Sequence, residues 1–239
     1  MTAKRACDVL LSLRVLCLAS PLLALAMFAV WAQDGGSPLY LTVRVGLGGR
    51  DFRMVKLRSM TVNAESRGGA STAKSDARIT PLGKWLRRCK LDELPQFWNV
   101  LTGEMSVVGP RPNLRRGGVE RYTTEELRLL TVRPGITDLA SIVFSDEADI
   151  LEGADDPDAR YDAVIRPWKS RLGLLYVARK DFAADLKIIW LTAMALAAKP
   201  VALAGVDAIL AGWDADADLR RICRRQAPPP RGVPPGRLA

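Results

Sequence analysis

Two adjacent carboxylates, Asp92 and Glu93, stand in a run of cationic side chains that includes Arg87 and Lys90. A carboxylate beside Arg and Lys is expected to stay ionised, and an ionised carboxylate can attack phosphorus as a nucleophile. Its hard oxygens are also suitable ligands for Mg²⁺. The bare pair therefore indicates phosphoryl chemistry, with a solvent-exposed salt-bridge patch as the ordinary alternative.

A conformationally restricted arginine follows the pair, in the segment Val108-Gly109-Pro110-Arg111-Pro112. The prolines restrict the backbone on both sides of Arg111, so its planar guanidinium is pre-organised to bind phosphate through two hydrogen bonds. This segment weakens the salt-bridge alternative. The residues by themselves predict a protein that handles phosphate groups, and they go no further.

The composition restricts the chemistry. The 239 residues include no histidine, which excludes Ser–His and Cys–His catalysis and zinc sites built on histidine. A total of 35 Lys and Arg against 26 Asp and Glu gives a formal charge of +9, which suits nucleic acid, anionic lipid or phosphorylated metabolites. The sequence has no basic patch interleaved with aromatic residues, which argues against nucleic acid as the partner.

The N-terminal segment carries an apolar run from Val15 to Trp31 with Pro21 inside it. A cleaved signal peptide and a straight transmembrane helix are two interpretations of this run. The third is a re-entrant hairpin broken at Ser20-Pro21, because proline kinks a helix and serine can satisfy a freed backbone group. Basic residues on both sides of the run place both flanks on the cytoplasmic face, which favours the hairpin. They are Lys4, Arg5 and Arg14 before the run and Arg44, Arg50, Arg53, Lys56 and Arg58 after it.

One hairpin and several helices are predicted to position the charged residues. Apolar alternation, capping residues and glycine or proline breaks define them. In chain order they are strands 40–45 and 52–57 around a glycine-rich turn, a loop over 61–77, helices beginning at Thr80-Pro81 and spanning 96–101, 124–132, 172–179 and 182–198, an acidic loop over 146–158 and a second apolar stretch over 201–213.

The segment 91–112, LDELPQFWNVLTGEMSVVGPRP, resembles the signature of the bacterial sugar transferases, the monotopic phosphoglycosyl transferases. The resemblance covers roughly residues 4–195 in order. Its other segments are Lys4-Arg5-x-x-Asp8, Ser20-Pro21, 52–60, 76–80, 132–137 and 185–189. The chain departs from the pattern at Cys89 and Lys90, where small hydroxyl residues are usual, and at Asp138 and Ser141, where Gly and Gln are usual.

The resemblance implies a ping-pong reaction. Asp92 matches the nucleophile, which would attack the β-phosphorus of a UDP-sugar and release UMP, and undecaprenyl phosphate would then accept the phosphosugar from Asp92. Glu93 matches the partner carboxylate, for Mg²⁺ coordination or proton handling, so the metal ligands implied are Asp92 and Glu93. The residues matching substrate-binding positions are Arg87 and Arg111, with Lys56, Arg58 and Arg133 as weaker matches. A catalytically inactive membrane scaffold of the same fold is the alternative, and the intact Asp92-Glu93 pair argues against it.

The implied fold is α+β and mostly helical: a single monotopic, membrane-associated domain with an N-terminal re-entrant helix-break-helix and a small β-hairpin. We divide the chain into a re-entrant membrane helix (1–36), a catalytic domain (37–198), an apolar C-terminal extension (199–219) and a disordered, basic, proline-rich tail (220–239). The implied partners are a UDP-sugar, undecaprenyl phosphate and membrane lipid, with no nucleic acid. The implied location is the bacterial cytoplasmic membrane with the catalytic domain facing the cytoplasm, and the oligomeric state, a dimer included, stays open.

Overall fold

The alternating residues around the glycine-rich turn form the predicted hairpin. Strand β1 (Leu39–Val45) pairs antiparallel with β2 (Asp51–Leu57) along their whole length. Because side chains alternate between the two faces of a strand, Phe52 and Met54 of β2 both point into the core and are buried. The hairpin therefore packs one face on the domain, and its prediction is confirmed.

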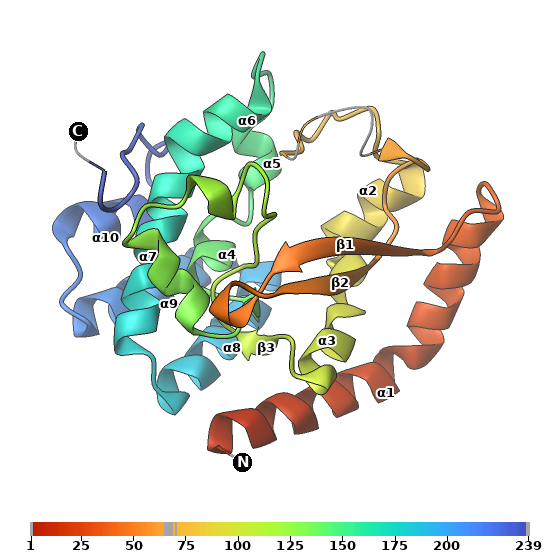
Figure 1. Ribbon diagram of the computed structural model, residues 1–239, viewed down its shortest axis with the longest axis horizontal. Coiled ribbons are helices and arrows are strands. Elements are labelled where there is room, and N and C mark those ends of the chain that lie inside the picture. Colours follow the sequence, from red (N-terminus) through yellow and green to blue (C-terminus); the bar gives the residue numbers. More distant parts are fainter. Residues whose placement is uncertain (1, 65–68, 70, 238–239) are drawn as a thin grey trace.

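The computed structural model describes residues 2–64, 69 and 71–237 (Figure 1). Part of the predicted loop over 61–77 lies outside these residues. The described chain is mostly helical, as predicted, with two small sheets. The other elements are α1 (Ala3–Ala32), η1 (Leu47–Gly49), α2 (Pro81–Arg88), η3 (Leu91–Glu93), α3 (Gln96–Thr102), β3 (Ser106–Val108), η4 (Val119–Arg121), η5 (Glu126–Thr131), β4 (Gly135–Thr137), α4 (Leu139–Val143), α5 (Glu147–Ile150), α6 (Pro157–Arg160), the π-helical turn η6 (Tyr161–Ile165), α7 (Arg166–Arg179), α8 (Phe182–Ala197), α9 (Lys199–Gly212) and α10 (Ala217–Cys223).

Helix α1 is the one described helix that is long and apolar enough to cross a membrane, judged by length and composition. The backbone stays helical through Pro21, and Figure 1 shows that the helix bends between its two halves. Pro21 has no N–H for the carbonyl of Cys17, and the hydroxyl of Ser20 donates to that carbonyl instead, at 2.8 Å. The predicted break is therefore a bend in a continuous helix, and the return of the chain to one membrane face stays a prediction.

The N-terminal end of α1 is hydrogen-bonded to the rest of the domain. Lys4 Nζ lies 2.6 Å from Asp185 Oδ2 and donates to the carbonyl of Val108 at 3.0 Å. The Asp8 carboxylate accepts from the backbone N–H of Val107 at 3.0 Å and from the hydroxyl of Ser106 at 2.9 Å. The matched segment Lys4-Arg5-x-x-Asp8 thus ties α1 to strand β3.

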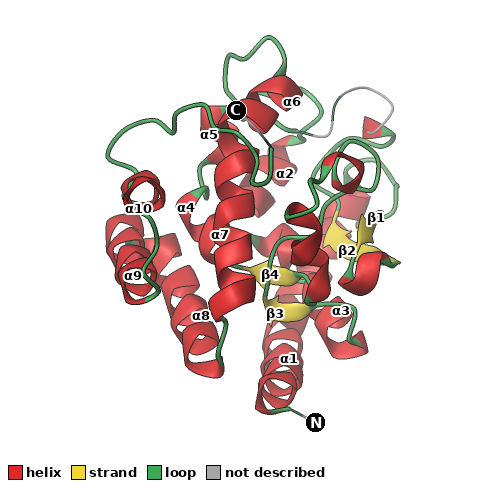
Figure 2. Cartoon of the chain, turned by 60° about the vertical axis from the view of Figure 1, so that its left-hand side comes forward, coloured by secondary structure: helices red, strands yellow, loops and turns green. Residues whose placement is uncertain are grey.

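The main core lies among the helices on one side of the molecule, where α7, α8, α9 and α10 gather around α4 (Figure 2). The predicted apolar stretch over 201–213 is part of α9, and its buried residues pack on the domain. They are Ala202, Leu203, Val206 and Leu210. A smaller cluster joins α1 to β2 and α2 through Ala26, Val30, Leu57 and Leu86.

The second sheet is a parallel pair, β3 and β4, that the sequence patterns did not predict. It brings the segment around Gly109 against the segment around Gly135. A Cβ on Gly135 would lie 2.1 Å from the backbone nitrogen of Gly109, and a Cβ on Gly109 would lie 2.4 Å from the carbonyl oxygen of Arg133. Glycine at both positions is therefore required by the close approach of two backbones, and this approach fixes the chain immediately before Arg111.

Three predicted segments differ from the structure. The helix over 124–132 is the shorter 3₁₀ helix η5, and the acidic stretch 146–158 contains the short helices α5 and α6. The tail from Arg220 was predicted to be disordered, but residues 220–223 belong to α10 and the chain after them packs on α7. In these segments tertiary contacts decide the local structure, and composition alone does not reveal them.

Candidate active site

The carboxylate pair lies on a single helical turn between α2 and α3. The N-cap Thr80 and the prolyl N-terminus of α2 start the helix that leads into the turn, as predicted, and the hydroxyl of Thr80 accepts from Gly83 N–H at 2.9 Å. Lys90 adopts the left-handed conformation, with φ 56°, and turns the chain into η3. Asp92 and Glu93 are therefore presented side by side on a backbone fixed at both ends.

Glu93 is held by two cations from different parts of the chain. Lys56 Nζ of β2 lies 3.2 Å from Glu93 Oε1, and the guanidinium of Arg111, which follows β3, pairs with both carboxylate oxygens. Burial alone would raise the pKa of Glu93, but Arg111 and Lys56 outweigh it and hold that pKa well below the usual range. Burial also lowers the pKa of Lys56 to about 8, although Glu93 opposes the shift. Glu93 is thus a fixed anion.

Asp92 is different from its neighbour. Its side chain is buried, and its Oδ1 atom has no hydrogen-bond partner among the described residues. Burial and the charge of Glu93 raise the pKa of Asp92, and Lys56, Arg87 and Lys90 offset this only in part. We expected the surrounding cations to favour the ionised form of Asp92, but their strongest contacts go to Glu93 instead. A buried carboxylate oxygen without a partner is costly in a folded protein, and a ligand, an ion or a water molecule at Asp92 would remove that cost.

The five predicted substrate-binding residues divide into two groups. Lys56 and Arg111 contact Glu93 directly, and Arg87 is close enough for its charge to act on Asp92 while its Nε donates to Ser59 Oγ at 2.9 Å. The structure thus brings these three cations to the carboxylate pair.

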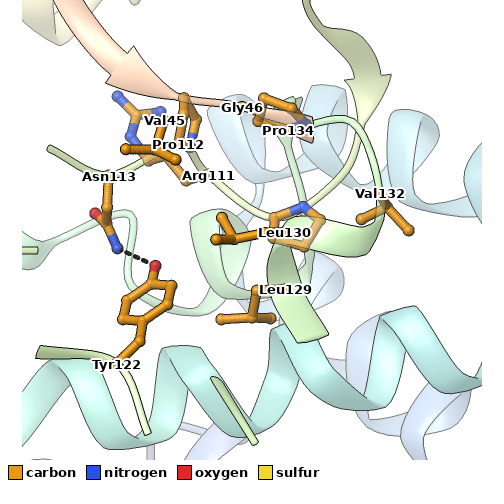
Figure 3. A pocket seen from close by; sticks show the side chains of 11 residues that line it. Val45, Gly46, Arg111, Pro112, Asn113, Tyr122, Leu129, Leu130, Val132 and Pro134 are labelled. Carbon is orange, nitrogen blue, oxygen red and sulfur yellow. Dashed lines mark hydrogen bonds between the residues drawn. The ribbon is translucent and has the colours of Figure 1, made fainter. Parts of the chain in front are cut away.

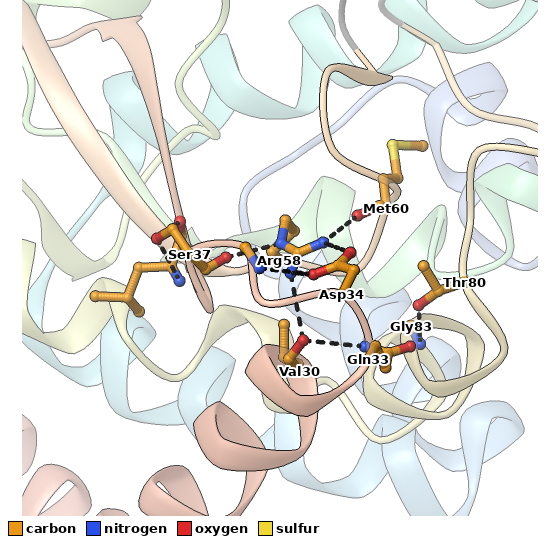
Figure 4. A network of polar contacts seen from close by, with 10 residues as sticks. Val30, Gln33, Asp34, Ser37, Arg58, Met60, Thr80 and Gly83 are labelled. Atoms are coloured by element: carbon orange, nitrogen blue, oxygen red, sulfur yellow. Dashed lines mark hydrogen bonds and ion pairs between the residues drawn. The ribbon is translucent and has the colours of Figure 1, made fainter.

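Arg58 and Arg133 have other partners. Arg58 is buried at the end of α1, where its guanidinium pairs with both carboxylate oxygens of Asp34 at 2.6 Å and donates to the carbonyl of Val30 at 3.3 Å (Figure 4). Arg133 is exposed in part and donates to the carbonyl of Gly103 at 2.9 Å. A substrate contact for these two arginines stays a prediction, and their described contacts are structural.

A cavity of about 50 Å³ adjoins Arg111 on the side of α7. Its lining includes two of the positions where the chain departs from the family pattern, Asp138 and Ser141, together with Tyr161 and Lys169. Lys169 pairs with Glu147, and its ammonium lies 5.4 Å from the ring centre of Tyr161. Cations and an aromatic ring around a polar cavity suit an anionic ligand with a planar group.

Arg111 also lines a second, narrower pocket, which Figure 3 shows from close by. In it the side-chain amide of Asn113 donates to the hydroxyl of Tyr122 at 2.6 Å. Arg111, Asn113 and Tyr122 each line both pockets, so the two pockets meet at Arg111. The patterns around Asp92 did not predict the contributions of Tyr122, Tyr161 and Lys169, because these residues lie far along the chain and carry no local motif.

Comparison of the sequence with known proteins assigns the chain to a family. A model described as "Bacterial sugar transferase" matches residues 1–199. The chain belongs to the bacterial sugar transferase family. The matched region includes every residue named so far at the carboxylate pair and along the larger cavity. It ends before most of α9, α10 and the segment that follows.

Two relatives of this chain are named as enzymes that act on a nucleotide sugar and undecaprenyl phosphate. The UDP-glucose:undecaprenyl-phosphate glucose-1-phosphate transferase of Klebsiella pneumoniae is 38% identical over 195 residues, which cover 80% of this chain and 39% of the relative. The UDP-N-acetylgalactosamine-undecaprenyl-phosphate N-acetylgalactosaminephosphotransferase of Aeromonas hydrophila is 40% identical over 149 residues, 61% of this chain and 35% of the relative. The chain thus spans less than two fifths of the length of these two relatives. The sugar transferase EpsL of Bacillus subtilis, described as uncharacterized, is 33% identical over 192 residues, 80% of this chain and 86% of the relative.

Proposed function

We propose that the chain transfers a sugar 1-phosphate from a UDP-sugar to undecaprenyl phosphate through a covalent intermediate on Asp92. The observation that carries this proposal is the buried Oδ1 atom of Asp92, which has no described partner, beside a Glu93 that Lys56 and Arg111 hold in place. Phosphoryl transfer depends mainly on positioning and on neutralising charge, and this arrangement supplies both.

The first half-reaction forms the bond between Asp92 and phosphorus. A carboxylate oxygen of Asp92 attacks the β-phosphorus of the UDP-sugar, and the bond to the bridging oxygen breaks as UMP leaves with the electron pair. Arg111, beside the larger cavity, is suited to bind the diphosphate, and Lys56 and Arg87 add positive charge around the reacting group.

The second half-reaction regenerates the enzyme. A phosphate oxygen of undecaprenyl phosphate attacks the same phosphorus, and the bond to Asp92 breaks to restore the carboxylate. The product is a lipid-linked sugar diphosphate, so atoms and charges balance without a redox partner. UMP has left by this stage, which gives the ping-pong order that the resemblance implies.

The residues also fit a magnesium ion. Asp92 has an uncommitted carboxylate oxygen and can contact the ion, whereas both oxygens of Glu93 already accept from cations. Mg²⁺ commonly needs only one or two carboxylates when substrate phosphates and water complete its shell. When bound, the ion would neutralise charge on the diphosphate.

The position of α1 supports a re-entrant arrangement in the membrane. Its N-terminal end is tied to β3 through Lys4 and Asp8, and its C-terminal end is tied to the hairpin through Arg58. A helix with both ends bonded to one domain cannot place those ends on opposite sides of a bilayer without separating the domain. The apolar side chains between the ties are exposed and suit lipid, among them Leu18 at 84%, Leu25 at 65% and Phe28 at 62%. The catalytic domain would then lie at the surface where a lipid phosphate presents its headgroup.

A UMP-release assay tests the proposal. The full chain in nanodiscs is incubated with undecaprenyl phosphate and a panel of UDP-sugars, and the phosphosugar adduct on Asp92 is sought by mass spectrometry after incubation with donor alone. We expect UMP release from at least one donor and an adduct on Asp92. Release of UDP in place of UMP would contradict the proposed bond cleavage.

A further inference from the structure

The segment 225–236, called the strap here, leaves α10 and runs back across the domain without helix or strand. It lies outside the region that matches the sugar transferase family. Its composition led us to predict disorder, yet it is tied to the domain at four points along its length.

The first two ties hold the start and the middle of the strap. Arg225 donates to Asp146 Oδ2 at 2.8 Å and lies over the ring of Phe144, 5.6 Å from its centre. Farther along, the indole N–H of Trp168 donates to the carbonyl of Pro230 at 2.9 Å, and Trp168 is buried. A buried indole N–H needs a partner, and in this structure the strap provides it.

The last two ties hold the end of the strap. The backbone N–H of Gly232 donates to the carbonyl of Ala163 at 2.9 Å, in the π-helical turn η6. The hydroxyl of Thr123 donates to the carbonyl of Pro235. Prolines keep such a segment extended and stiff before it binds, so the strap loses little conformational entropy when it is ordered.

Three of the four tie points on the domain lie within two residues in sequence of residues that line the larger cavity. Thr123 follows Tyr122, Ala163 is two residues from Tyr161, and Trp168 precedes Lys169. Asp146 precedes Glu147, the partner of Lys169. The strap therefore spans the junction between two distant segments, 121–126 and 161–170, that line one side of this cavity through Tyr122 and through Tyr161, Arg166, Lys169 and Ser170.

Those two segments are also in direct contact, mainly around the buried Arg166. Arg166 donates to the carbonyl of Arg121 at 2.6 Å and pairs with Glu126 at 2.9 Å, and Glu126 in turn accepts from Ser170 at 2.6 Å. Arg121 also pairs with Asp162, so the two segments stay joined near Arg166 when the strap is released. Arg166 joins the segments directly, and the strap joins them through separate contacts to Thr123, Ala163 and Trp168.

We propose that the strap is a positioning element that holds the cavity wall in the shape needed by the nucleotide end of the donor. This inference rests on the proposed function for the identity of the ligand, while the holding of the wall rests on the contacts alone. It assigns part of donor recognition to a segment outside the family match. The residues that act directly on the wall are Trp168 and Thr123, as positioning residues.

Two variants loosen the strap without touching the cavity. A Cβ on Gly232 would lie 3.1 Å from Pro167 and 3.2 Å from the Trp168 ring, so Gly232→Ala pushes the strap outward. Thr123→Val keeps the side-chain shape and removes the hydroxyl, which donates to the carbonyl of Pro235 and also accepts from the Glu126 N–H at 3.2 Å. Gly212→Ala at the end of α9 is the matched control, because its Cβ would meet nothing within 4 Å.

Hydrogen exchange and steady-state kinetics are measured on the full chain in nanodiscs. In Gly232→Ala and Thr123→Val we expect faster exchange over 161–168 and a rise in KM for the UDP-sugar of about 3- to 10-fold, as loss of one hydrogen bond would give, with kcat nearly unchanged. Gly212→Ala should match the wild type in both. If Gly232→Ala does not fold, Thr123→Val carries the test.

Unchanged exchange in both variants would overturn the inference, and so would faster exchange with an unchanged KM. If the wild type releases no UMP from any donor, the proposed function fails, and the exchange data still decide whether the strap holds the wall.

Discussion

Lys56 and Arg58 stand two residues apart at the end of β2 and serve two different ion-pair centres. Lys56 joins Arg111 on Glu93, beside Asp92, whereas Arg58 pairs with Asp34 at the end of α1. Both centres are built from arginine bound through two hydrogen bonds to a carboxylate. They differ in whether a buried polar atom is left without a hydrogen-bond partner.

At Arg58 every guanidinium nitrogen has a protein acceptor, and Asp34 accepts from the same arginine and from the Gly36 N–H (Figure 4). At Glu93 both carboxylate oxygens accept from cations, but the adjacent Asp92 keeps a buried oxygen without a described partner. A network in which every polar atom has a partner stabilises the folded state. A buried polar atom without a partner costs free energy, which is recovered when a ligand binds it. The two centres contain the same types of residue, and they differ in whether every buried polar atom has a hydrogen-bond partner.

Replacing Asp92 should give the largest loss of activity. Asp92→Asn keeps the size of the side chain but removes the nucleophile, so kcat should fall roughly 10⁴-fold or more and no adduct should form with donor alone. Relief of a buried carboxylate should leave the melting temperature unchanged or higher. UMP release and thermal unfolding, both in nanodiscs, measure these effects. Activity close to that of the wild type would remove Asp92 from the mechanism.

Arg111→Lys should have the next largest effect. Lysine keeps a positive charge but cannot bind phosphate or Glu93 through two parallel hydrogen bonds, so kcat/KM should fall about 30- to 1000-fold. Arg115→Lys is a matched control, because Arg115 pairs with Asp51 at the surface. Full activity in Arg111→Lys would mean that the site needs positive charge alone.

The pH dependence of kcat/KM should follow Asp92 on the acid side and Lys56 on the alkaline side. The pKa of Asp92 is raised, so the nucleophile is lost as the pH falls through that value. The pKa of Lys56 is lowered to about 8, so its charge, and the attraction for an anionic donor, is lost as the pH rises through about 8. Lys56→Arg stays charged and should abolish the alkaline decline. An unchanged alkaline limb in that variant would assign it to another group.

The local elements and the carboxylate pair could be predicted from the sequence, because each has a short-range signal. The Thr80-Pro81 cap, the glycine turn of the hairpin and the Asp92-Glu93 pair are examples. The parallel pairing of β3 with β4 has no local signal, since it depends on the approach of Gly109 to Gly135 across 25 intervening positions in the chain. The same holds for the different environments of Asp92 and Glu93: the sequence shows which cations are near, and only the fold decides which carboxylate they bind.

Replacing Arg58 should change activity least and stability most. The structure binds Arg58 to Asp34 and to carbonyls of α1, so Arg58→Lys should lower the free energy of unfolding by about 1–3 kcal/mol, as expected when buried acceptors lose a charged donor, and leave kcat/KM nearly unchanged. Asp34→Asn is the matched variant, because it breaks the same pair and keeps Arg58. Arg58 lowers the pKa of Asp34 to about 2, so the contribution of this carboxylate to stability is present above its ordinary pKa near 4 and is lost as the pH falls toward 2. Asp34→Asn should remove that acid-sensitive part. If Arg58 instead binds substrate, Arg58→Lys alone will lower kcat/KM while Asp34→Asn keeps it, and the saturated centre at the end of α1 will prove to be part of the active site.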